Sequence, residues 1–153
     1  MKHIFLSTSF SGQVNYDTGE VFPEFRTSIE TILTALRELL DVDVFCAVED
    51  EGWKISADLL DKGVQKDIEE VDFADTLIAL IHDAPSAGVQ FEIGYAVAKG
   101  KQVILAAQTE QPLAFFNEGL VSAGYITLVR YDTATDLVAQ LPAAVDALEE
   151  SLV

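Results

Sequence analysis

Hydrophobic residues recur along this chain at two different spacings. Between residues 23 and 40 they fall at every third or fourth position, which predicts an amphipathic helix with Arg26, Glu30 and Arg37 on its polar face. The run at 76–82 is almost entirely apolar, as expected for a strand buried on both faces of a sheet. Together these patterns predict strands at 4–7, 42–48, 76–82, 103–107 and 126–131, and helices at 23–40, 56–71, 89–99, 113–122 and 135–148.

The predicted strands alternate with helices, which is typical of βαβ units and a parallel sheet covered on both faces. We therefore expect an α/β fold, a single-domain flavodoxin-like or Rossmann-like three-layer sandwich over residues 1–153. Its five-stranded parallel sheet is expected to have the order 2-1-3-4-5. In such sheets ligands bind beyond the carboxyl ends of the strands, where the strand order reverses. The segments that follow the first four strands are therefore candidates for function: 7–12, 49–53, 83–92 and 108–112.

Charge and composition exclude several classes of function. The chain has 153 residues, with 9 Lys and Arg against 26 Asp and Glu, a net charge of −17. It has no basic stripe for a nucleic acid polymer and is repelled by anionic membranes. No apolar run approaches the roughly 18 residues of a membrane span, and the N-terminus enters a strand-like run rather than a signal peptide. We expect a cytoplasmic protein.

Metal and cofactor sites are also not expected. The single Cys and two His residues have no zinc-ligand spacing, and neither a Walker loop nor a Gly-x-Gly-x-x-Gly motif is present. The composition therefore favours a small-molecule or protein partner with no metal and no cofactor.

The segment after the third predicted strand contains the clearest candidate chemistry. Ser86 is placed to cap the following helix, and Glu92 falls near the start of that helix. The helix dipole there is expected to favour the ionised carboxylate, which suits a nucleophile or an acceptor for a sugar hydroxyl. The same helix N-terminus, with Ser86, is suited to hold a phosphate. The alternative is that Glu92 only complements the helix dipole.

Two further carboxylates, Asp67 and Asp75, precede the third strand. Asp67 lies on a predicted helix whose end reaches toward the same edge of the sheet. The alternative for Asp67 is a place on a solvated acidic face. Asp75 enters the strand at the opposite edge, which indicates a structural role.

The order and spacing of these residues resemble a known family. Asp67 and Asp75 are followed by an apolar strand, then by the motif Pro-Ser-x-Gly-Val-x-x-Glu-x-Gly over residues 85–94, and by Gly100-Lys101. This block is similar to the nucleoside 2-deoxyribosyltransferase superfamily, and closest to its 2′-deoxynucleoside 5′-phosphate N-hydrolase branch. The resemblance covers most of residues 3–107, and the loop at 13–22 looks like an insertion.

The resemblance implies cleavage of an N-glycosidic bond at C1′ with Glu92 as a carboxylate nucleophile. Asp67 matches a family carboxylate that positions the nucleophile or the sugar and takes part in proton transfer to the leaving base. Ser86 matches the phosphate-contacting serine of the N-hydrolases, where the transferases have an aspartate. It therefore favours a nucleoside 5′-monophosphate as substrate.

Other candidate substrate-binding residues surround this motif. The N-hydrolases have a basic residue in the loop after the first strand, and Ser11 stands at that place here. Gln90 stands where they have a glycine. The family contributes a polar residue across a subunit interface, for which Asn117 is the nearest substitute. Trp53 is placed to stack on a base or to cover the edge of the core. The full candidate set is Ser7, Ser9, Ser11, Gly12, Ser86, Gly88, Trp53 and Asn117.

Three functions remain open from the sequence. The first is an N-glycosidase that hydrolyses a (deoxy)nucleoside 5′-monophosphate through a Glu92 glycosyl-enzyme intermediate. The second is a nucleoside 2-deoxyribosyltransferase that exchanges bases between deoxynucleosides. The third, of another class, is a non-catalytic nucleotide-binding or sensor module, favoured by the missing basic phosphate contact. The resemblance implies a homodimer or higher homo-oligomer that binds a nucleoside or nucleoside monophosphate.

Overall fold

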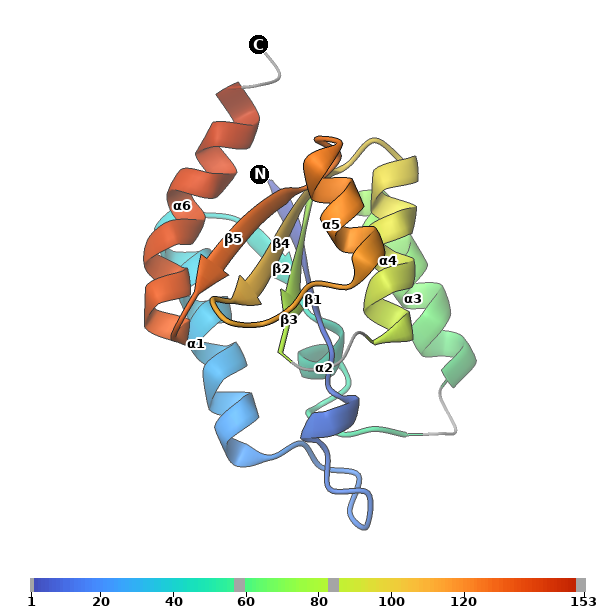
Figure 1. Cartoon of the computed structure of the whole chain (residues 1–153). Helices are drawn as coiled ribbons and strands as arrows, with labels where there is room; N and C mark the ends of the chain where they lie inside the picture. Colours follow the sequence, from blue (N-terminus) through green and yellow to red (C-terminus); the bar gives the residue numbers. More distant parts are fainter. Residues whose placement is uncertain (1, 57–59, 83–85, 151–153) are drawn as a thin grey trace.

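Five parallel strands form one sheet in the computed structural model, in the order β2-β1-β3-β4-β5 (Figure 1). The structure describes residues 2–56, 60–82 and 86–150, apart from the side chains of Ser11 and Glu149. The strands are β1 (His3–Thr8), β2 (Asp43–Phe45), β3 (Thr76–Ile81), β4 (Gln102–Gln108) and β5 (Thr127–Tyr131). The predicted α/β class and strand order are confirmed.

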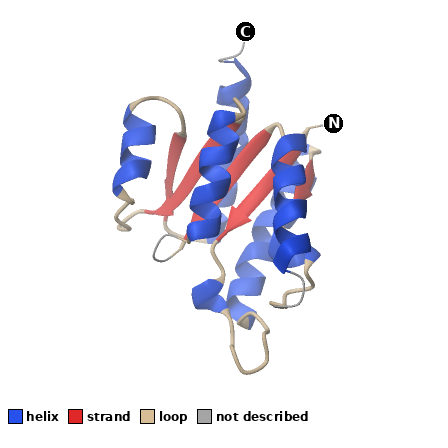
Figure 2. Cartoon of the chain, turned by 90° about the vertical axis from the view of Figure 1, so that its right-hand side faces the viewer, coloured by secondary structure: helices blue, strands red, loops and turns tan. Residues whose placement is uncertain are grey.

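Helices cover both faces of this sheet, which gives three layers (Figure 2). They are α1 (Pro23–Leu40), α2 (Ala47–Asp50), α3 (Leu60–Phe73), α4 (Ala87–Ala98), α5 (Phe115–Ser122) and α6 (Ala134–Glu150), with a short 3₁₀ turn, η1 (Ser11–Gln13). Helices α1 and α6 pack on one face, and α3, α4 and α5 pack on the other. Within the described ranges, no helix is both long enough and apolar enough to cross a membrane.

Each face of the sheet has its own hydrophobic core. Along β1, Ile4 and Leu6 belong to the cluster with α1 and α6, whereas Phe5 belongs to the cluster with α3 and α4. This alternation follows from the two-residue period of a strand. Because both faces are covered, every residue of β1 and β3 is buried.

Helix α1 has the bounds that the sequence predicts. Pro23 stands in its first turn, where a missing N–H has no cost, and Asp41 ends it in the left-handed region with φ of 49°. Its buried stripe is Phe25, Ile29, Ile32, Leu33 and Leu36.

The predicted strand at 42–48 is too long. Strand β2 ends at Phe45, and α2 begins at Ala47 after the buried Cys46. A short apolar run is compatible with a strand or with a buried helical turn, and here Val48 enters the core from the helical turn. This early turn places Glu51, the residue that caps α2, over the carboxyl edge of the sheet.

The insertion at 13–22 forms a small hairpin tied to the segment after α2. Val14 pairs with Val21, and Glu20 pairs with Lys54 across an isolated bridge. The Val21 N–H donates to the Trp53 carbonyl oxygen at 3.1 Å, and the Ile55 N–H donates to the Gly19 carbonyl oxygen at 2.8 Å. The hairpin therefore supports the chain that leads from Trp53 to the edge of the candidate site.

Candidate active site

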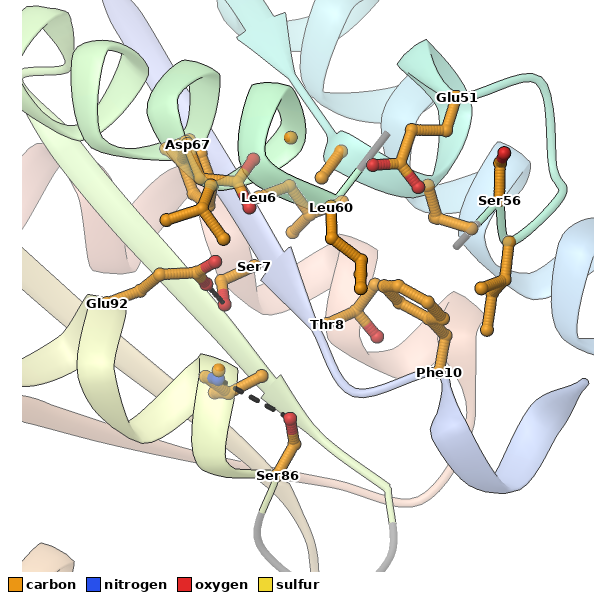
Figure 3. Close-up of a pocket in the computed structure, with 18 residues that line it drawn as sticks. Leu6, Ser7, Thr8, Phe10, Glu51, Ser56, Leu60, Asp67, Ser86 and Glu92 are labelled. Atoms are coloured by element: carbon orange, nitrogen blue, oxygen red, sulfur yellow. Dashed lines mark hydrogen bonds between the residues drawn. The ribbon is translucent and has the colours of Figure 1, made fainter. Parts of the chain in front are cut away.

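A cavity of about 370 Å³ lies at the carboxyl edge of the sheet, at the reversal of strand order between β1 and β3. Its walls come from the end of β1, from α2 and the following loop, from α3, and from the first turns of α4 (Figure 3). Five of the candidate residues from the sequence line it: Ser7, Asp67, Ser86, Gly88 and Glu92.

Ser7 and Glu92 are in direct contact in this cavity. The Ser7 hydroxyl, on β1, donates a hydrogen bond to Oε2 of Glu92 in the second turn of α4. Because Ser7 is buried in the central part of the sheet, this bond holds the Glu92 carboxylate against the floor of the cavity.

Burial changes the expected protonation of Glu92. The pKa of this carboxyl is raised to about 7, mainly by burial; the Ser7 hydrogen bond lowers it and the charge of Asp67 adds to the increase. The expectation that the helix dipole keeps Glu92 readily ionised is therefore wrong. The dipole acts mainly within the first turn of a helix, and Glu92 lies beyond it in a desolvated position.

Asp67 is a second carboxyl group with a raised pKa at the same cavity. It lies on α3, and Figure 3 shows its carboxylate on the same side of the cavity as Glu92. Burial and the charges of Glu51 and Asp50 raise its pKa to about 6, and Lys66 partly opposes them. Two acids with pKa values near neutrality in one cleft can exchange protons with a bound molecule near physiological pH.

The first turn of α4 borders the cavity on its other side. Ser86 caps the helix by accepting a hydrogen bond from the Val89 N–H at 3.5 Å, as the sequence predicts. Ser86, Gly88 and Val89 all line the cavity. Because N–H groups of the first turn have no partner within a helix, this wall is suited to an anion.

Four other candidate residues lie outside the described lining of this cavity: Ser9, Gly12, Trp53 and Asn117. Ser9 is buried next to it, and Gly12 lies in η1 with its surface exposed. Trp53 is buried in the core under the Arg26 guanidinium, 5.1 Å from its ring centroid. Asn117 is buried on α5, and its Oδ1 has no hydrogen-bond partner among the described residues. The side chain of Ser11 is outside what the structure describes.

Several lining residues were not singled out from the sequence. Thr8 follows Ser7 and has a buried Oγ1 without a hydrogen-bond partner among the described residues. Glu51 caps the C-terminus of α2, and Leu60 is the first residue of α3. Thr8 and Glu51 lie in two of the candidate segments that follow predicted strands, 7–12 and 49–53. The sequence does not show which side chains of these segments enter the cavity.

The charges around this cavity are unbalanced. Glu51, Asp67 and Glu92 line it, and none of the described lining residues is Lys or Arg. Among the described residues, no group of His, Cys, Asp and Glu is arranged to hold a metal ion. The arrangement suits acid–base and nucleophilic chemistry by carboxylates.

Comparisons with known proteins identify a family for this chain. A family model described as nucleoside 2-deoxyribosyltransferase matches residues 20–139. Comparison with curated protein sequences gives no match.

Solved structures share the fold. The CMP N-glycosidase BcmB of Clostridium botulinum is 20% identical, with a TM-score of 0.67 over 92% of this chain and 99% of its own. BlsM is 25% identical, with a TM-score of 0.76 over 94% of this chain and 88% of its own. A 2-deoxyribosyltransferase of Bacillus psychrosaccharolyticus is 18% identical, with a TM-score of 0.63 over 89% of this chain and 90% of its own.

Proposed function

The chain belongs to the nucleoside 2-deoxyribosyltransferase family, and we propose that it is an N-glycosidase that hydrolyses a nucleoside 5′-monophosphate. The observation that carries this proposal is the Ser7–Glu92 contact, which fixes a carboxylate in a cleft beside a second acid, Asp67. The names of two structural neighbours, an N-glycosidase and a deoxyribosyltransferase, support the N-glycosidic bond as the bond that is cleaved.

In the first half of the reaction, a Glu92 carboxylate oxygen attacks C1′ of the sugar. The C1′–N bond breaks, its electron pair goes to the nitrogen of the base, and Asp67 supplies the proton that the base takes up. The sugar is then an ester of Glu92. The Ser7 hydroxyl orients the attacking carboxylate throughout.

Water completes the reaction in the second half. Asp67, now ionised, removes a proton from a water molecule that attacks C1′, and Glu92 leaves as a carboxylate. Two displacements at C1′ retain its configuration. The active form of the free enzyme therefore has Glu92 ionised and Asp67 protonated, which near neutral pH is one of the forms that a pair with pKa values of about 7 and about 6 provides.

The phosphate is assigned to the α4 wall of the cavity. Ser86 and the N–H groups of the first helical turn are neutral donors there. The Thr8 hydroxyl, which has no hydrogen-bond partner among the described residues, also lines the cavity. A net charge of −17 supplies no long-range attraction for a dianion, so affinity has to come from these local donors.

A transferase is the second candidate. Three carboxylates line the cavity, and its described lining has no cationic side chain, which favours an uncharged nucleoside over a phosphorylated one. In that reaction a second base, instead of water, attacks the Glu92 ester.

Incubation with nucleosides and with their 5′-monophosphates, with and without a free acceptor base, tests the proposal. Free base released from monophosphates alone is the expected result by chromatography. Exchanged nucleoside that forms only with an acceptor base supports the transferase. Absence of both products contradicts a catalytic function and favours the binding or sensor module.

We also propose that the protein is a homodimer or a higher homo-oligomer. Phe91 on α4 and Phe115 and Phe116 on α5 are 54%, 91% and 75% exposed, and these helices cover the same face of the sheet (Figure 2). Aromatic residues are enriched at protein interfaces, and these three are exposed on helices of one face. A mass of one chain in light scattering contradicts this part of the proposal.

A further inference from the structure

Glu51 is the acidic residue at the end of the cavity away from Glu92. It caps the C-terminus of α2, and Figure 3 shows its carboxylate turned into the cavity, across from Glu92 and Ser86. It has no role in the steps at C1′ described above. The charge of Glu51 nevertheless acts on Asp67, the group assigned to protonate the leaving base.

Gly63 leaves room for this carboxylate. A Cβ at Gly63, in the interior of α3, would lie 3.1 Å from Oε1 of Glu51, closer than most real contacts. The missing side chain of Gly63 permits this close approach without a shift of the Glu51 carboxylate. The structure thus holds the Glu51 carboxylate against the backbone of α3 and at the cavity wall.

The surroundings of Glu51 at this end are mostly apolar. Phe10, Ile55, Leu60 and Val64 line it, with the Ser56 hydroxyl as the other polar side chain nearby. Flat apolar walls suit the faces of a nucleobase, but they offer nothing to its hydrogen-bonding edge. The polar groups that can pair with that edge are the Ser56 hydroxyl, which can donate or accept, and the Glu51 carboxylate, which when ionised only accepts and can therefore discriminate.

We propose that Glu51 determines base specificity by accepting a hydrogen bond from an exocyclic amino group, so that amino-bearing bases are preferred over their oxo-bearing counterparts. This inference rests on the proposed function, because it takes the molecule cleaved at C1′ to be a nucleoside or its monophosphate. The opposite ends of one cavity then have separate tasks, with the sugar and phosphate near Glu92 and Ser86 and the base edge near Glu51.

The chemistry of the carboxylate explains the preference. An ionised carboxylate has only acceptors, so it pairs with an amino group as it does with the N4 amine of cytosine in other protein sites. A carbonyl oxygen at the same place leaves the carboxylate unpaired and repelled. Sites that pair a polar group of the substrate discriminate strongly against analogues that lack it.

The test compares kcat/KM for two matched substrate pairs, cytidine with uridine 5′-monophosphate and adenosine with inosine 5′-monophosphate. At about pH 8, where a glutamate ionises, the wild-type protein is expected to prefer the amino member of at least one pair about 10- to 100-fold. In Glu51→Gln the preference is expected to fall to within about threefold, because an amide can pair with either group.

Glu49→Gln is the matched control. Glu49 lies on α2, two residues before Glu51, but its carboxylate pairs with Arg37 at 2.7 Å and is not among the residues that line the cavity. This variant should keep the wild-type preference. A preference that is absent from the wild-type protein, or unchanged in Glu51→Gln with a wild-type melting temperature, overturns the inference while release of base still supports the proposed function.

If no turnover is observed, a binding measurement distinguishes failure of the inference about Glu51 from failure of the proposed function. Calorimetric titration of Glu92→Gln with the same four monophosphates measures their dissociation constants, and thus the base preference, in a variant expected not to cleave them. The expected result is tighter binding of the amino member, lost when Glu51→Gln is added. Equal affinity for both members of each pair overturns the inference, whereas absence of turnover in the wild-type protein contradicts only the proposed function.

Discussion

The Ser7 hydroxyl donates a hydrogen bond to Oε2 of Glu92, which lies 85 residues further along the chain. The bond joins a central strand of the sheet to the helix that follows β3, so the position of the candidate nucleophile is set by the fold itself. It also favours the ionised form of Glu92 against a burial that raises its pKa to about 7. Ser7 is therefore a positioning residue with a measurable electrostatic effect.

Substitution Ser7→Ala should lower kcat/KM below neutral pH and move the alkaline limb of its pH profile to higher pH, because Glu92 has the higher pKa of the pair. Loss of a hydrogen bond to an ionised group raises the pKa of Glu92, by up to about one unit. We expect kcat/KM to fall roughly tenfold near pH 6 and less near pH 8. The exposed Ser122→Ala serves as a matched control. A wild-type kcat/KM near pH 6 together with an alkaline limb at the wild-type position in Ser7→Ala contradicts this role.

The wild-type pH profile of kcat/KM should be bell-shaped with its maximum between about pH 6 and pH 7. Below this range both carboxyl groups are protonated and Glu92 cannot attack, and above it both are ionised and Asp67 cannot protonate the base. The two limbs belong to the pair rather than to either residue.

Asp67→Asn removes the alkaline limb in this account. Its residual activity should rise with pH and then stay level, at a rate about 10²–10⁴-fold lower because general acid catalysis is lost. An alkaline limb that persists in this variant assigns the proton donor to another group.

Much of the fold could be predicted from the sequence, because its apolar residues recur with the periods of helices and strands. Both ends of helix α1 could be predicted, because Pro23 marks its first turn and its five buried side chains follow the period of a helix. Strand β2 could not, because the apolar run at 42–48 suits a strand and a buried turn equally, and packing of Val48 decides between them.

The candidate site could be predicted where a motif lies on one segment. Ser86, Gly88 and Glu92 belong to one motif at the start of α4, and all three line the cavity. The sequence could not predict whether the Trp53 side chain faces the cavity or the core, and the structure places it in the core. The sequence also does not show that the Glu51 side chain enters the cavity, because its place beside Gly63 depends on how α2 and α3 pack. The raised pKa of Glu92 could not be predicted either, because it results from burial by residues of β1, α3 and α4 that are distant in the sequence.

Glu92→Gln should stabilise the fold at alkaline pH. An acid with a higher pKa in the folded than in the unfolded state contributes stability below the unfolded value, and this contribution is lost as the pH rises through the folded value. For Glu92 that window runs from 4.5 to about 7. Removing the buried charge should therefore add on the order of 1–3 kcal/mol near pH 8 and little near pH 4.

Thermal melts of both proteins across this pH range measure the effect. At roughly 2–4 °C for each kcal/mol, the difference in Tm should grow steadily from acid to alkaline pH. A difference in Tm that does not vary with pH contradicts the assignment of a buried, ionisable Glu92.

His3 should contribute stability without affecting activity. At the edge of the sheet opposite the cavity, its buried ring lies 2.9 Å from Oδ2 of Asp43 and 2.8 Å from Oε2 of Glu70, joining β1, β2 and α3. His3→Ala leaves both carboxylates unpaired and should cost about 1–3 kcal/mol with kcat/KM unchanged. Glu70→Gln should also lower Tm, and the exposed Glu69→Gln should not. Equal Tm values for these two variants contradict the role of His3.

The ester on Glu92 is the central claim, and mass spectrometry of the acid-quenched reaction tests it most directly. During turnover of a nucleoside 5′-monophosphate, the peptide that contains Glu92 should gain the mass of the sugar phosphate without its base, and fragmentation should place the gain on Glu92. Glu92→Gln should show no such peptide and should lose orders of magnitude in turnover. Release of free base with the adduct on another residue, or at the wild-type rate in Glu92→Gln, would contradict the account.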